Sequence, residues 1–344
     1  MKTDVLIVGA GPAGCAAAIR ARQSGLSVEI IEAKPVPGLA PGETLHPGIE
    51  PLLKQLGVLD QVVRAGFRRH LGIWIEREGQ RQFSPYGEDK DGPWRGFQVD
   101  RRMFHQILQQ AALDAGATLI RNASPQAVLT AGGRVRGVVI EDRHVRANWT
   151  LDATGRSAWL ARTLALPASW RSPPLRGRFG WGKSGWKHLD DQPSFVFRDD
   201  GWDWHAPLGP TRIAWVTLRI GENNRHPAGI DLTWRFHPRC AGPGFFLLGD
   251  AAATLDPASS HGVLRAMMSG VLAGHLVAGC QYEGVTERAV IESYRTWLCA
   301  QFTSDEQRMR QEYANSPARR RFLAESVPAL SPNNYAAKRM LFHK

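Results

Sequence analysis

Gly9-Ala10-Gly11-Pro12-Ala13-Gly14 decides the fold, because it matches the G-x-G-x-x-G pattern of dinucleotide-binding turns. An apolar run over residues 4–8 precedes this turn and small residues through about residue 21 follow it, so we expect a buried strand and then a helix. Gly9 permits the tight turn, Gly11 lets the backbone approach a pyrophosphate, and Gly14 lets the helix pack closely on the strand. Pro12 and Ala13 begin the helix, whose N-terminal amides direct partial positive charge at the phosphates.

A second apolar run, over residues 28–31, completes a β-α-β unit with a right-handed crossover. Glu32 ends this run, 18 residues after Gly14. A carboxylate there accepts hydrogen bonds from ribose hydroxyls and repels a 2′-phosphate, so the site favours FAD or NAD over NADP. We expect Glu32 and its neighbour Ala33 to contact the cofactor. The alternative is a glycine turn and a surface glutamate in an ordinary α/β protein.

The segment that begins at Gly249 favours FAD over NAD. Asp250 follows an apolar run and precedes a helix, so its carboxylate can accept from the ribityl hydroxyls of a flavin. The helix is expected to start around residues 259–263, with its N-terminal amides beside the negatively charged edge of reduced flavin. Without a flavin this segment would have no ligand to serve. The residues expected to contact the flavin here are Gly249, Asp250, Pro257, Gly262 and Val263.

The rest of the chain predicts further helices and strands and a second, sheet-rich region. From about residue 166 to residue 236 tryptophan becomes frequent and apolar residues alternate with polar ones, which favours a mostly antiparallel sheet. The other predicted elements are helices over 46–66, 101–115 and most of 258–325, and strands over 71–84, near 117–121, over 134–151 and at 245–249.

We therefore predict an α/β (α+β) fold, in which a Rossmann-like FAD-binding domain is interrupted by an inserted antiparallel-sheet substrate domain. A C-terminal helical region completes the chain. The predicted boundaries are 1–70, 95–165 and 240–285 for the FAD-binding domain, 71–94 and 166–239 for the substrate domain, and 286–344 for the helical region.

Composition bounds the class of protein. Hydrophobic residues make up 43% and charged residues 22% of the 344 residues, as in a globular rather than a disordered chain. No apolar run approaches the ~20 residues of a membrane span. The N-terminus enters a strand at once, so no signal peptide and a cytoplasmic location are expected. The four cysteines form no C-x-x-C pair, which favours free thiols over zinc or disulfides.

The formal net charge of +11 could serve nucleic acid, an anionic cofactor or an acidic partner. The arginines come in short groups without a continuous basic stripe, and no nucleic-acid module accompanies them. We expect no nucleic-acid partner. No second G-x-G-x-x-G turn is flanked by strand and helix, so the electrons are expected from transiently bound NAD(P)H or from a separate flavin reductase.

A third motif, Asp152-Ala153-Thr154-Gly155, lies between the other two. The three motifs in this order resemble the flavoprotein group that contains p-hydroxybenzoate hydroxylase, geranylgeranyl reductase and the flavin-dependent halogenases, over roughly residues 1–275. The resemblance implies that Asp152 and Gly155 lie near the cofactor pyrophosphate. It also implies that Arg101, in a segment like Gln98-Val99-Asp100-Arg101, reaches the phosphates. The alternative for Arg101 is a solvated surface arginine.

Further segments resemble a narrower set, the LodB/GoxB-like and QhpG-like flavoproteins that mature quinone-cofactor oxidases. These segments are Gly42-Glu43-Thr44-Leu45, Asp231-Leu232-Thr233-Trp234-Arg235, and the run from Leu255 through Arg265. The resemblance implies oxygenation of a tryptophan side chain in a partner protein, a step toward cysteine tryptophylquinone. Only about 30 residues separate the strand ending near Leu218 from Gly249, where the enzymes that this chain resembles commonly carry extra helices over the substrate cavity. The resemblance therefore implies an open pocket that suits a protein substrate; the alternative is a poorly sealed cavity with weak or uncoupled turnover.

Two residues are candidates for catalysis. His261 belongs to the loop expected to face the flavin, where it could donate a proton; the alternative is a capping or packing histidine. Glu43 follows a glycine in a turn expected near the flavin edge, where it could handle protons; the alternative is a carboxylate interacting with a helix dipole.

Several functions stay open. The first is an FAD-dependent monooxygenase acting on tryptophan in a partner protein or on a small aromatic molecule. The second is an FAD-dependent reductase or dehydrogenase of a small hydrophobic molecule. Halogenation is disfavoured, because the region where halogenases carry their lysine, about residues 68–90, contains only Lys90, in a polar loop. This holds although residues 202–207 resemble the W-x-W-x-I-P segment of halogenases. The last is a flavin-binding protein without catalytic activity.

Overall fold

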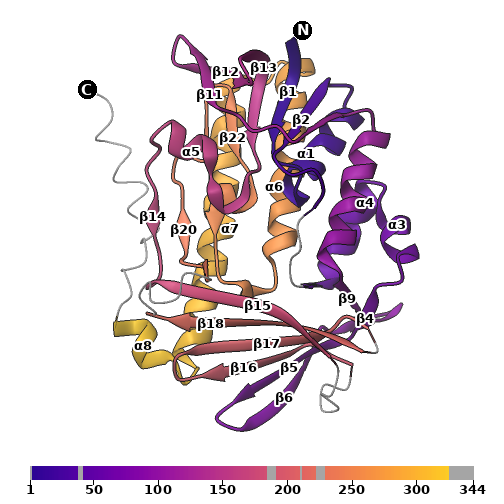
Figure 1. Cartoon of the computed structure of the whole chain (residues 1–344), viewed down its shortest axis with the longest axis vertical. Helices are drawn as coiled ribbons and strands as arrows, with labels where there is room; N and C mark the ends of the chain where they lie inside the picture. Colours follow the sequence, from indigo (N-terminus) through magenta and orange to yellow (C-terminus); the bar gives the residue numbers. More distant parts are fainter. Residues whose placement is uncertain (1, 38–41, 184–190, 210, 222–228, 325–344) are drawn as a thin grey trace.

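The computed structural model describes residues 2–37, 42–183, 191–209, 211–221 and 229–324. These residues form two large sheets with long helices between and beside them (Figure 1). The predicted fold class is confirmed: an α/β unit with a Rossmann-like sheet is combined with a mostly antiparallel sheet. The predicted domain boundaries remain a prediction, and residues 325–344 of the C-terminal region lie outside the described part.

The first large sheet contains the β-α-β unit. β1 is buried on both faces, with Val5, Leu6 and Ile7 at 0% exposure, because neighbours cover both sides of a parallel core strand. Its parallel strands are β1 (Lys2–Val8), β2 (Val28–Glu32), β10 (Thr118–Arg121), β13 (Arg143–Asp152) and β22 (Phe245–Leu247). Antiparallel additions are β11 (Ala127–Ala131), β12 (Arg134–Ile140) and β21 (Ala241–Gly242).

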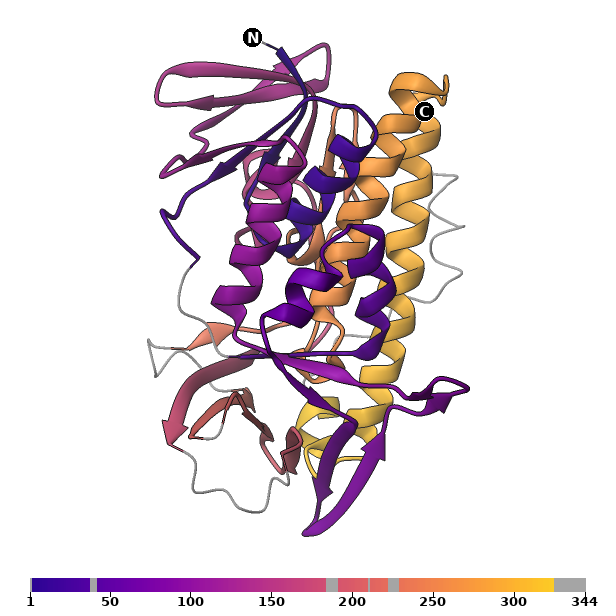
Figure 2. The same ribbon diagram turned by 90° about the vertical axis from the view of Figure 1, so that its right-hand side faces the viewer.

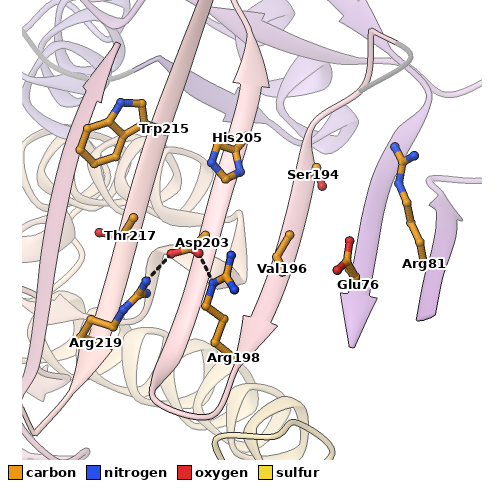
Figure 3. Close-up of a pocket in the computed structure, with 10 residues that line it drawn as sticks. All are labelled: Glu76, Arg81, Ser194, Val196, Arg198, Asp203, His205, Trp215, Thr217 and Arg219. Atoms are coloured by element: carbon orange, nitrogen blue, oxygen red, sulfur yellow. Dashed lines mark hydrogen bonds and ion pairs between the residues drawn. The ribbon is translucent and has the colours of Figure 1, made fainter. Parts of the chain in front are cut away.

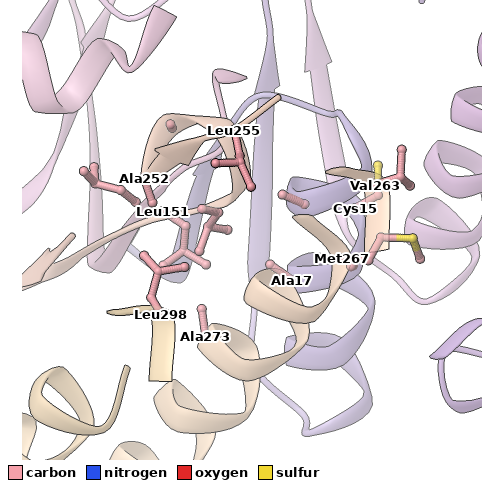
Figure 4. Packing of buried hydrophobic residues seen from close by; sticks show 14 of the residues in the cluster. Cys15, Ala17, Leu151, Ala252, Leu255, Val263, Met267, Ala273 and Leu298 are labelled. Carbon is pink, nitrogen blue, oxygen red and sulfur yellow. The ribbon is translucent and has the colours of Figure 1, made fainter. Parts of the chain in front are cut away.

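Four long helices stand side by side against this sheet: α4 (Arg101–Asp114), α1 (Pro12–Gln23), α6 (Gly262–Tyr282) and α7 (Glu287–Ala314) (Figure 2). α1 and α6 approach closely, because Gly270 and Gly274 of α6 lie against the backbone of Ala13 and Ala17. Figure 4 shows the buried side chains that gather around this crossing. Among the described residues α6 is the one helix long and apolar enough to cross a membrane, and in this structure it packs on α1 and α7.

The helix expected over residues 46–66 is instead broken. A short 3-10 turn (Pro47–Ile49) leads into α2 (Glu50–Gln55), and α3 (Leu59–Arg64) follows. Gly57 between them has a φ of +73°, a left-handed conformation that ends the first helix. The remaining short helices are α5 (Trp159–Thr163) and α8 (Arg319–Ala324).

The second large sheet confirms the antiparallel region and the strands expected over 71–84. Its order is β19 (Ile230–Asp231), β15 (Leu175–Lys183), β18 (Arg212–Ile220), β17 (Gly201–Pro207), β16 (Ser194–Arg198), β5 (Gly72–Arg77) and β6 (Gln80–Pro85). Every pair is antiparallel except β16 with β5.

Short strands were missed by the sequence analysis, because two to four residues give no periodicity. They form a sheet of β3 (Glu43–Leu45), β9 (Gly96–Val99) and β4 (Arg68–His70), a sheet of β14 (Ser169–Trp170), β20 (Arg235–Phe236) and β23 (Ala253–Thr254), and a hairpin of β7 (Glu88–Asp89) and β8 (Gly92–Pro93).

One face of the seven-stranded sheet carries an open, polar hollow of about 740 Å³ (Figure 3). The buried carboxylate of Asp203 lies at its centre and accepts hydrogen bonds from Arg198 and, at 2.8 Å, from Nη2 of Arg219. Two guanidinium groups therefore compensate this carboxylate, as a buried charge requires.

Candidate active site

A cavity of about 770 Å³ opens where β1, β2, β13 and β22 end. In a parallel sheet the carboxyl ends of the strands meet at one edge, and ligands of such folds bind there. The cavity extends to the second sheet. Of the residues expected at the site, those that line it are Gly9, Gly11, Pro12, Ala13, Glu32, Ala33, Glu43, Arg101, Gly155, Gly249, Asp250, Pro257, Gly262 and Val263. Gly14, Asp152 and His261 do not line it.

The glycine-rich turn has the shape that its expected roles require. Gly9 has a φ of +105°, and a Cβ built on it would lie 2.4 Å from the carbonyl oxygen of Ala153. A Cβ on Gly14 would lie 2.0 Å from the carbonyl oxygen of Gly9. A Cβ on Gly11 would meet no atom within 4 Å, so the space beside this residue belongs to the cavity. Gly9 and Gly14 serve packing, and Gly11 leaves room for a ligand.

Two helices, α1 and α6, begin at the cavity, and no side chain caps their N-termini. α1 begins after Gly11 and α6 begins after His261, and neither residue accepts a hydrogen bond from the first turn through its side chain. By contrast, Asp100 caps α4 by accepting from the amides of Arg102 and Met103. The first amides of a helix have no partner within the helix. Those of α1 and α6 are therefore free to stabilise negative charge in the cavity.

Glu32 is fixed at the edge of the cavity by the backbone. Its Oε2 accepts from the amide of Ala10 at 2.8 Å, and its Oε1 accepts from the amide of Lys34 at 2.9 Å. A carboxylate has about four acceptor positions, so both oxygens can accept further hydrogen bonds. The orientation suits a sugar hydroxyl.

Two ion pairs of the same kind line the cavity. Nη1 of Arg101 lies 3.5 Å from Oε2 of Glu43, and Nε of Arg156 lies 3.5 Å from Oδ2 of Asp250. Burial raises the pKa of Glu43, while the positive charge of Arg101 opposes that rise. Arg101 stands at the start of α4, where a cation is locally unfavourable, and Glu43 offsets part of that cost.

Asp152 braces the loop of the third motif, and its carboxylate does not line the cavity. The side chain is fully buried and accepts from the amide of Thr154 at 2.9 Å, from the hydroxyl of Thr154 at 2.6 Å and from the amide of Leu160 at 2.8 Å. Burial raises the pKa of Asp152, and these hydrogen bonds oppose the rise. Its influence on a ligand is therefore indirect, through the position of Gly155.

Replacing Asp152 with alanine is expected to lower the free energy of unfolding by about 3 kcal/mol, because buried amides lose their acceptor. Urea unfolding of the two proteins measures the difference. Asp4→Ala is the control, since its carboxylate also accepts from a backbone amide but at an exposed position, and a small change is expected there. Equal losses in the two variants would contradict the bracing role.

His261 lies beside the cavity rather than in its wall. The loop reaches the cavity through Ser260 and Gly262, whereas the His261 ring packs near the His46 ring, with centroids 5.0 Å apart. Burial lowers the pKa of His261 to about 4, so the imidazole is neutral at pH 7. The structure thus does not bring His261 and Glu43 together in the cavity wall, and direct proton donation by His261 is disfavoured.

The sequence analysis missed residues that the cavity brings to its wall. Nε2 of the half-buried His105 is itself buried and has no hydrogen-bond partner in the described part of the chain. It follows Arg101 by four residues on α4, and this helical spacing was a readable signal. Arg156 directly follows Gly155. Trp202 and Asp256 also line the cavity, but their contacts come from distant segments that spacing could not reveal.

The cavity residues fit a flavin dinucleotide. One end offers the glycine turn, free helix amides and cations, and the unpartnered Nε2 of His105 suits a polar ligand. The other end is apolar and aromatic, with Phe179, Phe195, Trp204 and Val216 from the second sheet. A flavin dinucleotide likewise has a polar part, with its phosphates and sugars, next to a flat ring system.

Comparison with known proteins agrees with this geometry. The family model for FAD dependent oxidoreductase matches residues 4–165. The digeranylgeranylglycerophospholipid reductase of Methanothrix thermoacetophila is 27% identical over 333 residues, covering 83% of this chain and 80% of that protein. The myxobacterial chondrochloren halogenase CndH has a similar structure, with a TM-score of 0.82 and 20% identity, covering 99% of this chain and 89% of that one.

PqsL of Pseudomonas aeruginosa, named as a probable FAD-dependent monooxygenase, gives a TM-score of 0.77 at 15% identity and covers 89% of this chain and 94% of that one. At such identities the two solved structures show a shared fold. The family match, the relatives and the cavity together identify this chain as an enzyme, an FAD-dependent oxidoreductase.

Proposed function

We propose that this enzyme is an FAD-dependent monooxygenase that oxygenates an aromatic substrate, such as a tryptophan side chain of a partner protein during cysteine tryptophylquinone biogenesis. The observation that carries the proposal is that a polar half, lined by the glycine turn and cations, adjoins an aromatic half within one cavity. Phe179 and Phe195 contribute to that aromatic half, which can pack against an indole ring. The sequence resemblance to proteins that mature quinone cofactors supports the choice of tryptophan.

We assign each residue of the cofactor site a role in this proposal. Glu32 and Ala33 would hold the ribose, the amides that follow Gly11 would hold the diphosphate with help from Arg101, and Asp250 would accept from the ribityl chain. The amides of Gly262 and Val263 would stabilise negative charge on the ring. When bound, FAD supplies the transfer of electrons from a donor to oxygen. The donor in this proposal is NAD(P)H or a separate flavin reductase.

Proton handling falls to Glu43. Its carboxyl lines the cavity, and burial raises its pKa, so Oε2 can hold a proton closer to neutral pH than an exposed glutamate can. His261 has no direct part in this proposal, because its ring packs beside the cavity against His46. The apolar side chains of the second sheet exclude water from the substrate half.

A second candidate function is reduction of a small hydrophobic molecule, favoured by the 27% identity to the archaeal lipid reductase. The apolar half of the cavity suits an isoprenoid chain as well as an aromatic ring. Halogenation is disfavoured, since Lys34 is the one lysine among the described lining residues and it lies near Glu32, at the ribose end.

The test combines the purified enzyme, FAD, NADH, a flavin reductase and ¹⁸O₂ with a tryptophan-bearing peptide in the presence of bromide. We expect one ¹⁸O atom in the peptide and no bromine. Reduction of geranylgeraniol without oxygen, and no label in the peptide, would instead assign the reductase function. Bromination of the peptide would assign the halogenase function. Absence of turnover with every substrate would favour a non-catalytic protein. The Gly11→Leu variant is the control, because it measures the rate at which free flavin alone modifies the substrate.

A further inference from the structure

Asp256 is a buried carboxyl in the cavity wall, bound by three neutral groups. Its exposure is 0%, and it lines the cavity together with Trp202. Oδ1 accepts from Nε1 of Trp202 at 3.1 Å and from the amide of Ala258 at 2.9 Å. Oδ2 accepts from the hydroxyl of Tyr313 at 2.6 Å. Three separate elements, β17, the loop before α6, and α7, thus meet at one carboxyl.

No cation in the described part of the chain pairs with this carboxyl. On the neighbouring helices Arg265 and Asp305 bind one another at 2.8 Å, and His261 is neutral at pH 7. The titratable group in contact with Asp256 is Tyr313, whose own pKa burial raises well above its usual value. Burial raises the pKa of Asp256 to about 6, and the hydrogen bond from Tyr313 opposes that rise. No positive charge therefore compensates the carboxylate, but fixed hydrogen-bond donors of the protein stabilise it.

The two carboxyl oxygens differ in what they can do. Oδ1 faces two N–H groups, which can only donate, so a proton on Oδ1 would clash with both. Oδ2 faces a hydroxyl, which can donate to a carboxylate or turn to accept from a carboxylic acid. The Tyr313 hydroxyl also lies 3.2 Å from Nε1 of Trp202, which donates to it in either state. Of the two oxygens, Oδ2 is therefore the one whose hydroxyl partner accommodates a proton.

We propose that Asp256 and Tyr313 form a proton-holding pair in the cavity wall, and that Oδ2 takes up a proton from solution when an anionic ligand fills the cavity. The identity of that ligand, FAD, rests on the proposed function. Negative charge brought near an uncompensated carboxylate favours its neutral form. The uptake forms one O–H bond at Oδ2 and changes no oxidation state. It leaves the site with a stored proton and less repulsion of an anionic ligand.

The first experiment follows the carboxyl C=O infrared band of the FAD-free protein from about pH 4 to about pH 8. We expect a band that titrates with a midpoint of about 6 and is absent in Asp256→Asn. Tyr313→Phe keeps the ring stacked on Phe322 but removes the donor, so the midpoint should rise by about one pH unit. A purely structural contact would not move the midpoint. An absent band, or an unmoved midpoint in Tyr313→Phe, overturns the pair.

The second experiment titrates FAD by calorimetry in buffers of different ionisation enthalpy near pH 6.5. We expect an uptake of about half a proton for each FAD bound, and none from this source in Asp256→Asn. Equal uptake in the two proteins overturns the coupling. If FAD fails to bind while the infrared titration behaves as expected, the proposed function fails and the proton-holding pair stands. If Asp256→Asn does not fold, Tyr313→Phe carries both experiments.

Discussion

Leucine in place of Gly11 is expected to weaken FAD binding at least about 100-fold, or about 3 kcal/mol, without a matching loss of stability. The residue has a φ of −78°, which any residue adopts, and a Cβ there meets no protein atom within 4 Å. The leucine side chain therefore fits the protein but occupies the space beside the first amides of α1. Calorimetric titration with FAD measures the affinity, and urea unfolding of the FAD-free protein measures the stability.

Gly182→Leu is the matched control for this experiment. Gly182 lies on β15, does not line the cavity, and also has no atom within 4 Å of a built Cβ. We expect wild-type affinity for FAD in this variant. If Gly11→Leu also bound FAD with wild-type affinity, the glycine turn would not be part of the binding site.

Alanine in place of Gly270 is expected to destabilise the protein by about 3 kcal/mol, because one methyl group cannot fit where α6 crosses α1. A Cβ on Gly270 would lie 2.2 Å from the carbonyl oxygen of Ala13 and 2.9 Å from the amide nitrogen of Ala17. Both are backbone atoms of α1, so the two helices must separate. Urea unfolding of the variant measures the loss.

The control on the same helix should give the opposite sign. A Cβ on Gly279 of α6 would lie 3.6 Å from its nearest neighbours, which is ordinary contact. Gly279→Ala should therefore stabilise the protein by up to about 1 kcal/mol through helix propensity. If the Gly270→Ala protein were as stable as wild type, α1 and α6 would not be packed as closely as these distances indicate.

The dinucleotide-binding part of the fold was predictable because its signals are local. The glycine motif Gly9–Gly14 predicts a turn, and Glu32 predicts the end of a strand in the same β-α-β unit. The turn and the strand end both lie where the spacing predicts them. The strand ending at Leu247 was equally readable as an apolar run. Each of these predictions needed only the neighbours of a residue along the chain.

The orientation of individual side chains was not predictable in the same way. Asp152 turns to the amide of Leu160 instead of the cavity, and His261 turns to His46, a residue far earlier in the chain. Asp256 bonds to a tyrosine 57 positions away. Such contacts depend on which helix packs against which loop, and sequence spacing carries no information about them. The break at Gly57 was missed because apolar periodicity continues across it.

The contact between α1 and α6 has a consequence for biosynthesis. The first cofactor amides follow Gly11, whereas the last follow His261, and β1 pairs with β13 as well as with its near neighbour β2. A nascent chain that has emerged only through its first hundred residues thus presents half a pocket with exposed small-residue surface. The amides at the starts of α1 and α6 are therefore present together only after the chain has been synthesised through the start of α6.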